Sequence, residues 1–209
     1  MRTLYVVTHP EATHHVEGLV GGWFDSALTK RGESDAAAIA AELQRRIPEG
    51  AVVDVVSSDL KRTTQTAEAI AGRLGVRFQL HDGLREASYG EAEGRPQAWL
   101  DRRFIPSPAT GERMRHWDGV PGSETKLQLV TRVYAALDDA LASEATHQVI
   151  VTHGFAGQFV LAGWIMMPIE SAGYVSFRLT PGGISVLRED AFFHNRQVTS
   201  LNEVSHLLG

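Results

Sequence analysis

The chain has 209 residues, of which 43% are hydrophobic and none is cysteine. These values are typical of a globular protein that buries a core without disulfides, and they fit the reducing cytoplasm, where we expect the protein to work. A net charge of −5 without a long basic block argues against a nucleic-acid partner. The longest apolar run, 159–168, is too short to cross a membrane, and the N-terminus lacks the features of a signal peptide.

Strand and helix patterns alternate along the chain. In chain order they predict a strand at 3–8, a helix within 26–47, a strand at 52–57, a helix at 60–74 and a strand at 76–80. They continue with a helix at 127–141, a strand at 148–152, a helix at 154–166, and a hairpin of 175–179 and 184–188 around Thr180-Pro181-Gly182-Gly183. We expect an α/β three-layer sandwich, with a mainly parallel central sheet, helices on both faces and an antiparallel edge strand.

The alternation of strand and helix patterns stops between about 91 and 120, a stretch with three prolines, Trp99 and Trp117. It also holds a cluster of arginines, namely Arg95, Arg102, Arg103, Arg113 and Arg115. A long irregular insertion in a compact domain is often a lid or a binding loop, although a solvated surface excursion fits as well. We expect one domain over 1–209 with this insertion as a lid, and we expect Arg102 and Arg103 to contact an anionic group of the substrate.

Four residues able to do chemistry follow predicted strands. His9 and His153 come at the ends of the first and fourth strands, Arg62 follows the second at the start of a helix, and Glu86 follows the third. In an α/β sheet, ligands bind outside the carboxyl ends of the strands. Two imidazoles, a guanidinium and a carboxyl suit phosphoryl transfer, in which an imidazole attacks phosphorus, positive groups hold the oxygens and an acid protonates the leaving oxygen. No step requires a metal, and we expect no cofactor.

Several short motifs, spread over nearly the whole sequence, match the pattern of a known enzyme family. They are Gly22-Trp23-Phe24-Asp25-Ser26-Ala27-Leu28-Thr29, Ser57-Ser58-Asp59-Leu60-Lys61-Arg62-Thr63-Thr64-Gln65-Thr66-Ala67, Leu84-Arg85-Glu86, Pro121-Gly122-Ser123-Glu124 and Val151-Thr152-His153-Gly154. In this combination and order, the chain resembles the histidine phosphatase superfamily of phosphoglycerate-mutase-like enzymes. The resemblance implies that His9 is the phosphorylated nucleophile, Arg62 a phosphate ligand and Glu86 the proton donor. His153 would stabilise charge on the phosphoryl group.

The first motif departs from the family pattern, Arg-His-Gly-Glu-Thr followed by an Asn. Thr8 stands in place of the arginine, Pro10 in place of the glycine, Ala12 in place of the threonine and His15 in place of the asparagine. Removing such an electrostatic donor typically costs about 10²–10³ in rate. A protonated His14 or His15 would restore part of the charge, and the Thr8 hydroxyl can donate. We expect Thr8, His15, Gly21, Gly22 and Gly154 to line the substrate site.

The resemblance implies a phosphatase that hydrolyses a small phosphorylated metabolite through a phosphohistidine, in a protein that can form a homodimer. A phosphoglycerate-mutase-like phosphoryl transferase is the nearest alternative. It is less favoured because true mutases have more insertion around the region equivalent to 91–120. A non-catalytic phospholigand-binding protein is a second alternative, which the departures at Thr8 and His15 favour. A metal site built from His9, His14, His15 and His153 is a third, although this segment lacks the expected acidic ligands.

Overall fold

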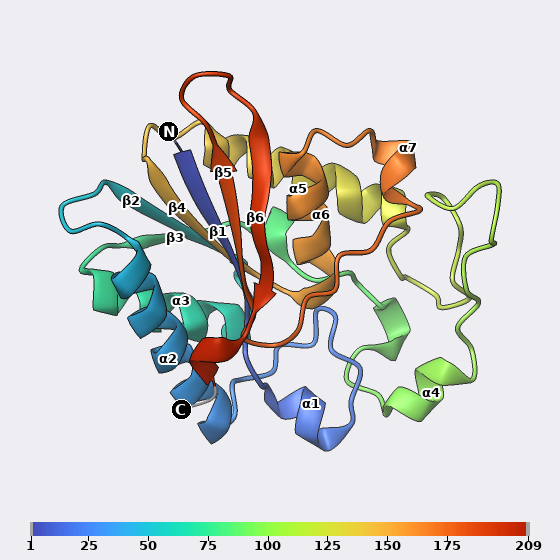
Figure 1. The fold of residues 1–209 in the computed structure, drawn as a ribbon. Coiled ribbons are helices and arrows are strands. Elements are labelled where there is room, and N and C mark those ends of the chain that lie inside the picture. The colour runs from blue at the N-terminus through green and yellow to red at the C-terminus, as the bar shows by residue number, and fades with distance from the viewer. Residues whose placement is uncertain (1, 208–209) are drawn as a thin grey trace.

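The computed structural model describes residues 2–207 and contains a mixed six-stranded sheet of order β3-β2-β4-β1-β5-β6 (Figure 1). The four strands on one side run parallel: β3 (Phe78–Leu80), β2 (Val53–Ser57), β4 (His147–Thr152) and β1 (Arg2–Thr8). The remaining two, β5 (Ile184–Glu189) and β6 (Arg196–Glu203), pair antiparallel at the other edge. The predicted fold class is therefore confirmed.

Helices cover both faces of the sheet (Figure 1). Helices α2 (Lys30–Arg46) and α3 (Lys61–Leu74) pack on one face, and α5 (Lys126–Leu141) and α6 (Gly154–Trp164) pack on the other. Shorter helices lie in the connections: α1 (Thr13–Glu17), α4 (Gln97–Asp101), α7 (Ile169–Ala172), and the 3₁₀ turns η1 (Asp82–Leu84), η2 (Gly90–Ala92) and η3 (Ser205–Leu207). No helix within residues 2–207 is both long enough and apolar enough to span a bilayer.

Strand β1 shows how the sequence builds both faces at once. Leu4 and Val6 point into the core beneath α5 and α6, whereas Tyr5 and Val7 point into the core beneath α2 and α3. All four are almost completely buried, as expected for a central strand covered on both sides. With its side chains buried on both faces, β1 holds its carboxyl end, and thus His9, in a fixed position.

Capping residues mark the ends of three helices. The Thr29 side chain accepts a hydrogen bond of 3.0 Å from the Gly32 N–H, which caps the start of α2. Helix α3 ends at Gly75, which has a left-handed φ of 69°. Helix α5 starts with a capping box in which Thr125 and Gln128 bond each other's backbone N–H groups.

The predicted hairpin of 175–179 and 184–188 is wrong. Residues 175–179 form no strand, and the partner of β5 is β6, which the sequence analysis missed. The turn at 180–183 crosses the end of β1 instead: the Gly182 N–H donates to the Thr8 carbonyl at 3.0 Å, and the Thr8 N–H donates to the Gly183 carbonyl at 3.0 Å. The turn residues Gly182 and Gly183 therefore hydrogen-bond the backbone of Thr8, next to His9.

Candidate active site

The strand ends bring the predicted residues together at one rim of the sheet. His9, Arg62 and Glu86 line a cavity of about 320 Å³. The fully buried His153 ring lies beside it, with its centroid 5.1 Å from that of His9. The same cavity is lined by five other predicted residues, namely Thr8, His15, Gly21, Gly22 and Gly154. Segments that are far apart in the sequence thus form one polar site.

His9 is held in a single tautomer by its two neighbours. Its Nδ1 lies 2.7 Å from the Pro10 carbonyl oxygen, which can only accept a hydrogen bond, so Nδ1 carries the proton. Its Nε2 lies 3.2 Å from Nε of Arg62, which can only donate. The lone pair is therefore on Nε2. Burial and the Arg62 charge lower the pKa of His9 well below the usual value, which keeps the ring neutral.

Arg62 is buried without a carboxylate partner. Only 1% of its surface is exposed. Besides His9, its guanidinium donates to the Gly22 carbonyl at 2.7 Å and to the Phe24 carbonyl at 2.9 Å. Burial lowers its pKa from 12.5 to about 10, so the group stays charged near neutral pH. The carboxylates of Glu86, Asp25 and Glu93 act on this charge only at a distance, so the guanidinium is free to pair with an anion that enters the cavity.

Gly22 has to be a glycine for this arrangement. Its φ of 56° lies in the left-handed region, and a Cβ there would come 3.0 Å from the Ala87 carbonyl and from the Glu93 side chain. Gly21 is equally restricted, because a Cβ would lie 2.8 Å from Nε2 of His14. Both glycines therefore shape the cavity wall through their backbone.

The start of α3 is not a free anion site. The Lys61 N–H donates to the Asp25 carboxylate at 2.6 Å, so a side chain of the chain itself already occupies this end of the helix dipole. Anion binding near this helix start therefore depends on the Arg62 guanidinium.

His153 carries one unpartnered nitrogen. Its Nε2 lies 2.9 Å from the Ser58 hydroxyl, whereas its Nδ1 is buried without a hydrogen-bond partner. Burial and Arg62 lower its pKa well below the usual value. Because buried polar groups in proteins are nearly always hydrogen-bonded, the orphaned Nδ1 indicates a position where a ligand atom binds. Ser58, which the sequence analysis quoted only as part of a motif, orients this ring.

His14 and His15 are both neutral near pH 7 in the unliganded protein. The His14 ring pairs through Nδ1 with the Ser26 hydroxyl at 2.6 Å, and burial lowers its pKa to about 3. His15 accepts the Ala12 N–H at Nδ1, and its pKa is lowered by burial and by Arg62. In its neutral form His15 therefore donates from Nε2. Neither ring supplies a resting positive charge in place of the missing arginine.

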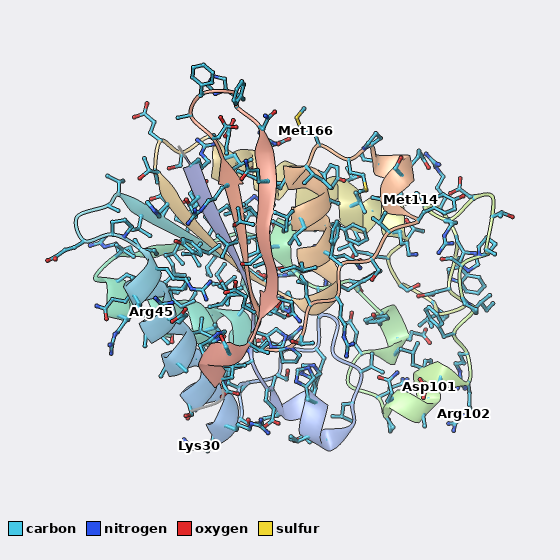
Figure 2. All side chains as sticks on the ribbon, in the orientation of Figure 1. Lys30, Arg45, Asp101, Arg102, Met114 and Met166 are labelled. Atoms are coloured by element: carbon cyan, nitrogen blue, oxygen red, sulfur yellow. The ribbon has the colours of Figure 1, made fainter. Side chains whose placement is uncertain are left out.

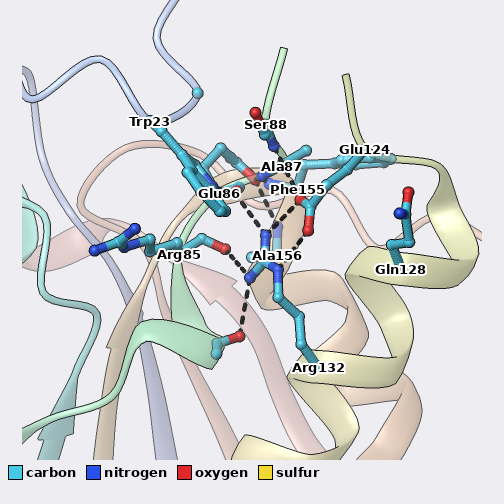
Figure 3. Close-up of polar contacts among 12 residues, drawn as sticks. Trp23, Arg85, Glu86, Ala87, Ser88, Glu124, Gln128, Arg132, Phe155 and Ala156 are labelled. Atoms are coloured by element: carbon cyan, nitrogen blue, oxygen red, sulfur yellow. Dashed lines mark hydrogen bonds and ion pairs between the residues drawn. The ribbon is translucent and has the colours of Figure 1, made fainter. Parts of the chain in front are cut away.

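Both carboxylate oxygens of Glu86 accept hydrogen bonds from backbone N–H groups. Oε1 accepts from Ala87 and Ala156, and Oε2 accepts from Phe155, each at 2.9 Å (Figure 3). Phe155 and Ala156 belong to the first turn of α6, where the helix dipole favours a negative charge. The carboxyl group is thus fixed in orientation at the wall of the cavity.

Arg132 holds the segment that carries Glu86, and the sequence analysis missed it. Its guanidinium donates to the carbonyls of Gly83, Arg85 and Glu86 at 2.7–2.9 Å (Figure 3). It also pairs with both oxygens of Glu124, at 2.8 and 2.7 Å. A planar guanidinium can make this set of bonds and a lysine cannot. The Trp23 indole N–H adds a bond of 2.8 Å to the Glu86 carbonyl.

Arg102 and Arg103 do not join the site. Both are exposed at the end of α4, and neither lines the cavity around His9 (Figure 2 shows Arg102 projecting outward). Arg103 instead stacks on the Trp99 ring, with its guanidinium carbon 4.0 Å from the ring centroid. Their contact with substrate stays a prediction. In the described part of the chain, 2–207, no group of three or more potential ligands is arranged to hold a metal ion.

Comparison with known proteins shows the family to which the chain belongs. The model of the histidine phosphatase superfamily (branch 1) matches residues 4–202. The chain belongs to the histidine phosphatase superfamily. Its relative named "Probable phosphoglycerate mutase GpmB", from Yersinia pestis (strain Pestoides F), is 30% identical over 180 residues, which cover 82% of this chain and 78% of the relative.

Two solved structures show the same fold. A mycobacterial glucosyl-3-phosphoglycerate phosphatase matches with a TM-score of 0.78 at 22% identity, over 98% of this chain and 100% of that chain. The alpha-ribazole phosphatase from Shigella flexneri matches with a TM-score of 0.76 at 22% identity, over 96% of each chain. At these identities the likeness establishes the fold.

The neutral buried histidines predict that the protein loses stability in acid. His9 and His153 are neutral when folded but take up protons in the unfolded chain below about pH 6.5. Their contribution to stability is complete above that pH. Below it, each should lower the free energy of unfolding by about 1.4 kcal/mol per pH unit. Urea unfolding between about pH 7.5 and about pH 5.5 measures this slope.

A histidine variant provides the control for that measurement. His153→Gln should reduce the slope, whereas His194→Asn, at an exposed turn position with a φ of 58°, should leave it unchanged. Equal unfolding free energies at both ends of the pH range would contradict the assignment of neutral histidines.

The Arg132 bonds predict a specific cost for Arg132→Lys. A lysine cannot satisfy three carbonyls and the partly buried Glu124 together, so the free energy of unfolding should fall by about 2–4 kcal/mol. Amide hydrogen exchange at residues 83–88 should be faster in Arg132→Lys than in wild type. The matched change Arg73→Lys, at an exposed arginine that bonds only Gln44 through its side chain, should have little effect. Unchanged exchange at 83–88 would contradict this positioning role.

Proposed function

We propose that the protein is a phosphatase that hydrolyses a small phosphomonoester through a phosphohistidine on His9. The observation that carries this proposal is the Nε2 lone pair of His9, which is fixed beside the buried Arg62 charge. A neutral imidazole is a nucleophile, and a preorganised guanidinium stabilises charge that develops on the phosphoryl oxygens. No cofactor takes part in these steps.

In the first half-reaction, His9 Nε2 attacks phosphorus and the bond from phosphorus to the alcohol oxygen breaks. The Arg62 N–H that rests on Nε2 is exchanged for bonds to the phosphoryl oxygens. The Pro10 carbonyl keeps its bond to Nδ1–H and offsets the positive charge of the phosphorylated ring. The unpartnered Nδ1 of His153 provides a further contact for the transferring group.

Glu86 supplies the proton to the leaving oxygen. In the free protein its oxygens accept three N–H bonds, an arrangement that suits the carboxylate. A bound phosphate dianion opposes a second negative charge in the same cavity and so favours the protonated carboxyl. In the second half-reaction the Glu86 carboxylate takes a proton from water, the water oxygen bonds to phosphorus, and the P–N bond to His9 breaks.

His15 can compensate for the missing arginine only when substrate is bound. Its pKa is lowered in the free protein, but a dianion beside it works in the opposite direction and favours the imidazolium. Catalysis should therefore strengthen as the pH falls, as far as the fold remains stable. The Thr8 hydroxyl, which also lines the cavity, adds a neutral donor.

The names of structural neighbours support hydrolysis over mutase chemistry. The relative GpmB is named a probable phosphoglycerate mutase, whereas two structural neighbours are named phosphatases. The mycobacterial phosphatase was also solved with VO3 and with inorganic phosphate. Vanadate is therefore a suitable probe for this cavity.

The phosphohistidine is testable by rapid quench with a ³²P-labelled aryl phosphate. Wild type should give an acid-labile adduct on His9, and His9→Ala should lower turnover by at least about 10³-fold. His194→Asn, far from the cavity, serves as the control. Wild-type activity in His9→Ala would overturn the role of His9, and a protein that binds vanadate but hydrolyses no ester in a broad panel would be a phospholigand-binding protein.

The replaced arginine gives a second test. Thr8→Arg with His15→Asn restores the usual family residues, and we expect turnover on simple phosphomonoesters to rise by about 10-fold or more. His15→Asn alone should weaken the increase in kcat/KM toward low pH, because it removes the titrating ring. The pH profile of kcat/KM measures this. An unchanged profile in His15→Asn would show that another group holds the phosphate.

A further inference from the structure

A second cavity lies on the other side of the segment that carries Glu86. It has a volume of about 390 Å³ and shares Tyr89 with the cavity around His9. Its walls come from residues 87–89, the starts of α5 and α6, and the segment 104–118. Since Ala87 lines this cavity and Glu86 lines the other, the proton donor of the proposed reaction stands between them.

The second cavity is lined by two cations that form no ion pair among the described residues. Arg113 and Lys126 both line it, and neither forms an ion pair within residues 2–207. Nε of Arg113 is buried without a hydrogen-bond partner. Burial and the neighbouring Arg113 lower the pKa of Lys126, as expected for two like charges in a poorly hydrated place.

The acids in this cavity are already engaged. Glu124 pairs with Arg132 and accepts the Ser88 N–H, and Asp118 accepts from the Val120 N–H and the Ser123 hydroxyl. Neither acid forms an ion pair with Arg113 or Lys126. Because both acids keep their negative charge, the cavity favours a monoanion over a dianion.

The remaining walls are mostly apolar. Phe104, Pro106, Leu129 and Phe155 contribute them, and Tyr89 stands at the boundary with the first cavity. A ligand group here therefore combines a ring or hydrocarbon with an acid at its far end. A three-carbon acid is too small to fill a space of about 390 Å³.

We propose that this second cavity binds the leaving group of the substrate, an alcohol or phenol that carries a carboxylate beyond an apolar spacer. The proposal rests on the proposed phosphatase function: with phosphorus at His9 and the leaving oxygen at Glu86, the rest of the substrate extends past Tyr89. Its carboxylate then pairs with Arg113 and Lys126, and its spacer packs against Phe104 and Phe155.

The test compares two matched esters, the phosphate ester of 3-(4-hydroxyphenyl)propanoate and that of the corresponding neutral amide. Wild type should favour the carboxylate in kcat/KM by about tenfold or more, as expected for a charge-assisted contact. Arg113→Met and Lys126→Met should each reduce this ratio to about threefold or less. Arg115→Met is the matched control, because Arg115 already pairs with Glu112 and Glu170 and should leave the ratio intact.

Several outcomes overturn the inference. If wild type has equal kcat/KM for the carboxylate and amide esters, Arg113 and Lys126 do not bind the carboxylate. The same conclusion follows if Arg115→Met lowers the kcat/KM ratio as much as Arg113→Met and Lys126→Met do. A preference for a phosphonate in place of the carboxylate, or for 3-phosphoglycerate over the aryl ester, would overturn the proposed leaving group. If no ester is hydrolysed, the phosphatase proposal fails, and calorimetric binding of the same two esters to His9→Ala still tests the cavity through the same ratio.

Discussion

The arrangement of the site depends on one buried positive charge without a negative partner. Arg62 is 1% exposed, and its donors reach two backbone carbonyls and one imidazole nitrogen, all of them neutral acceptors. Burying a charge in this way is costly unless an anion completes the site. The fold sustains the cost because β1 and α3 are packed in the core and the Gly22 backbone can approach the guanidinium closely. The site is therefore arranged to bind an anion, which the proposed function identifies as the phosphoryl group.

This charge also sets the state of the surrounding histidines. Together with burial, it keeps His9 and His153 neutral, and its Nε–H fixes the His9 lone pair on Nε2. The nucleophile and the phosphate ligand of the proposed reaction thus depend on one interaction. Together with burial, the same charge lowers the pKa of His15, so in the proposed reaction that ring gains a positive charge only when a substrate dianion is bound.

Much of this site was predictable because strand periodicity and helix caps are local signals. The pattern placed His9, Arg62, Glu86 and His153 at strand ends, and parallel pairing brought them to one rim. The turn signal of Pro181-Gly182-Gly183 was correct, but the pairing of β5 with β6 was not predictable, because the backbone beside this turn bonds Thr8 and residues 175–179 form no strand. Arg132 was missed for a similar reason: its five contacts lie 8 to 49 residues away in sequence.

The arginines of the insertion show where a charge pattern alone is insufficient. Density in sequence pointed to a whole cluster that included Arg102, Arg103 and Arg113, yet Arg103 stacks on Trp99, and only Arg113 of these three lines the second cavity, together with Lys126. Arg103 differs from Arg113 and Lys126 in that it lines neither of the two cavities. Both oxygens of Glu124 bond Arg132, whereas Arg113 and Lys126 form no ion pair within residues 2–207. Arg132 also bonds three carbonyls of the segment that carries Glu86. The segment between the two cavities is therefore held by this single guanidinium.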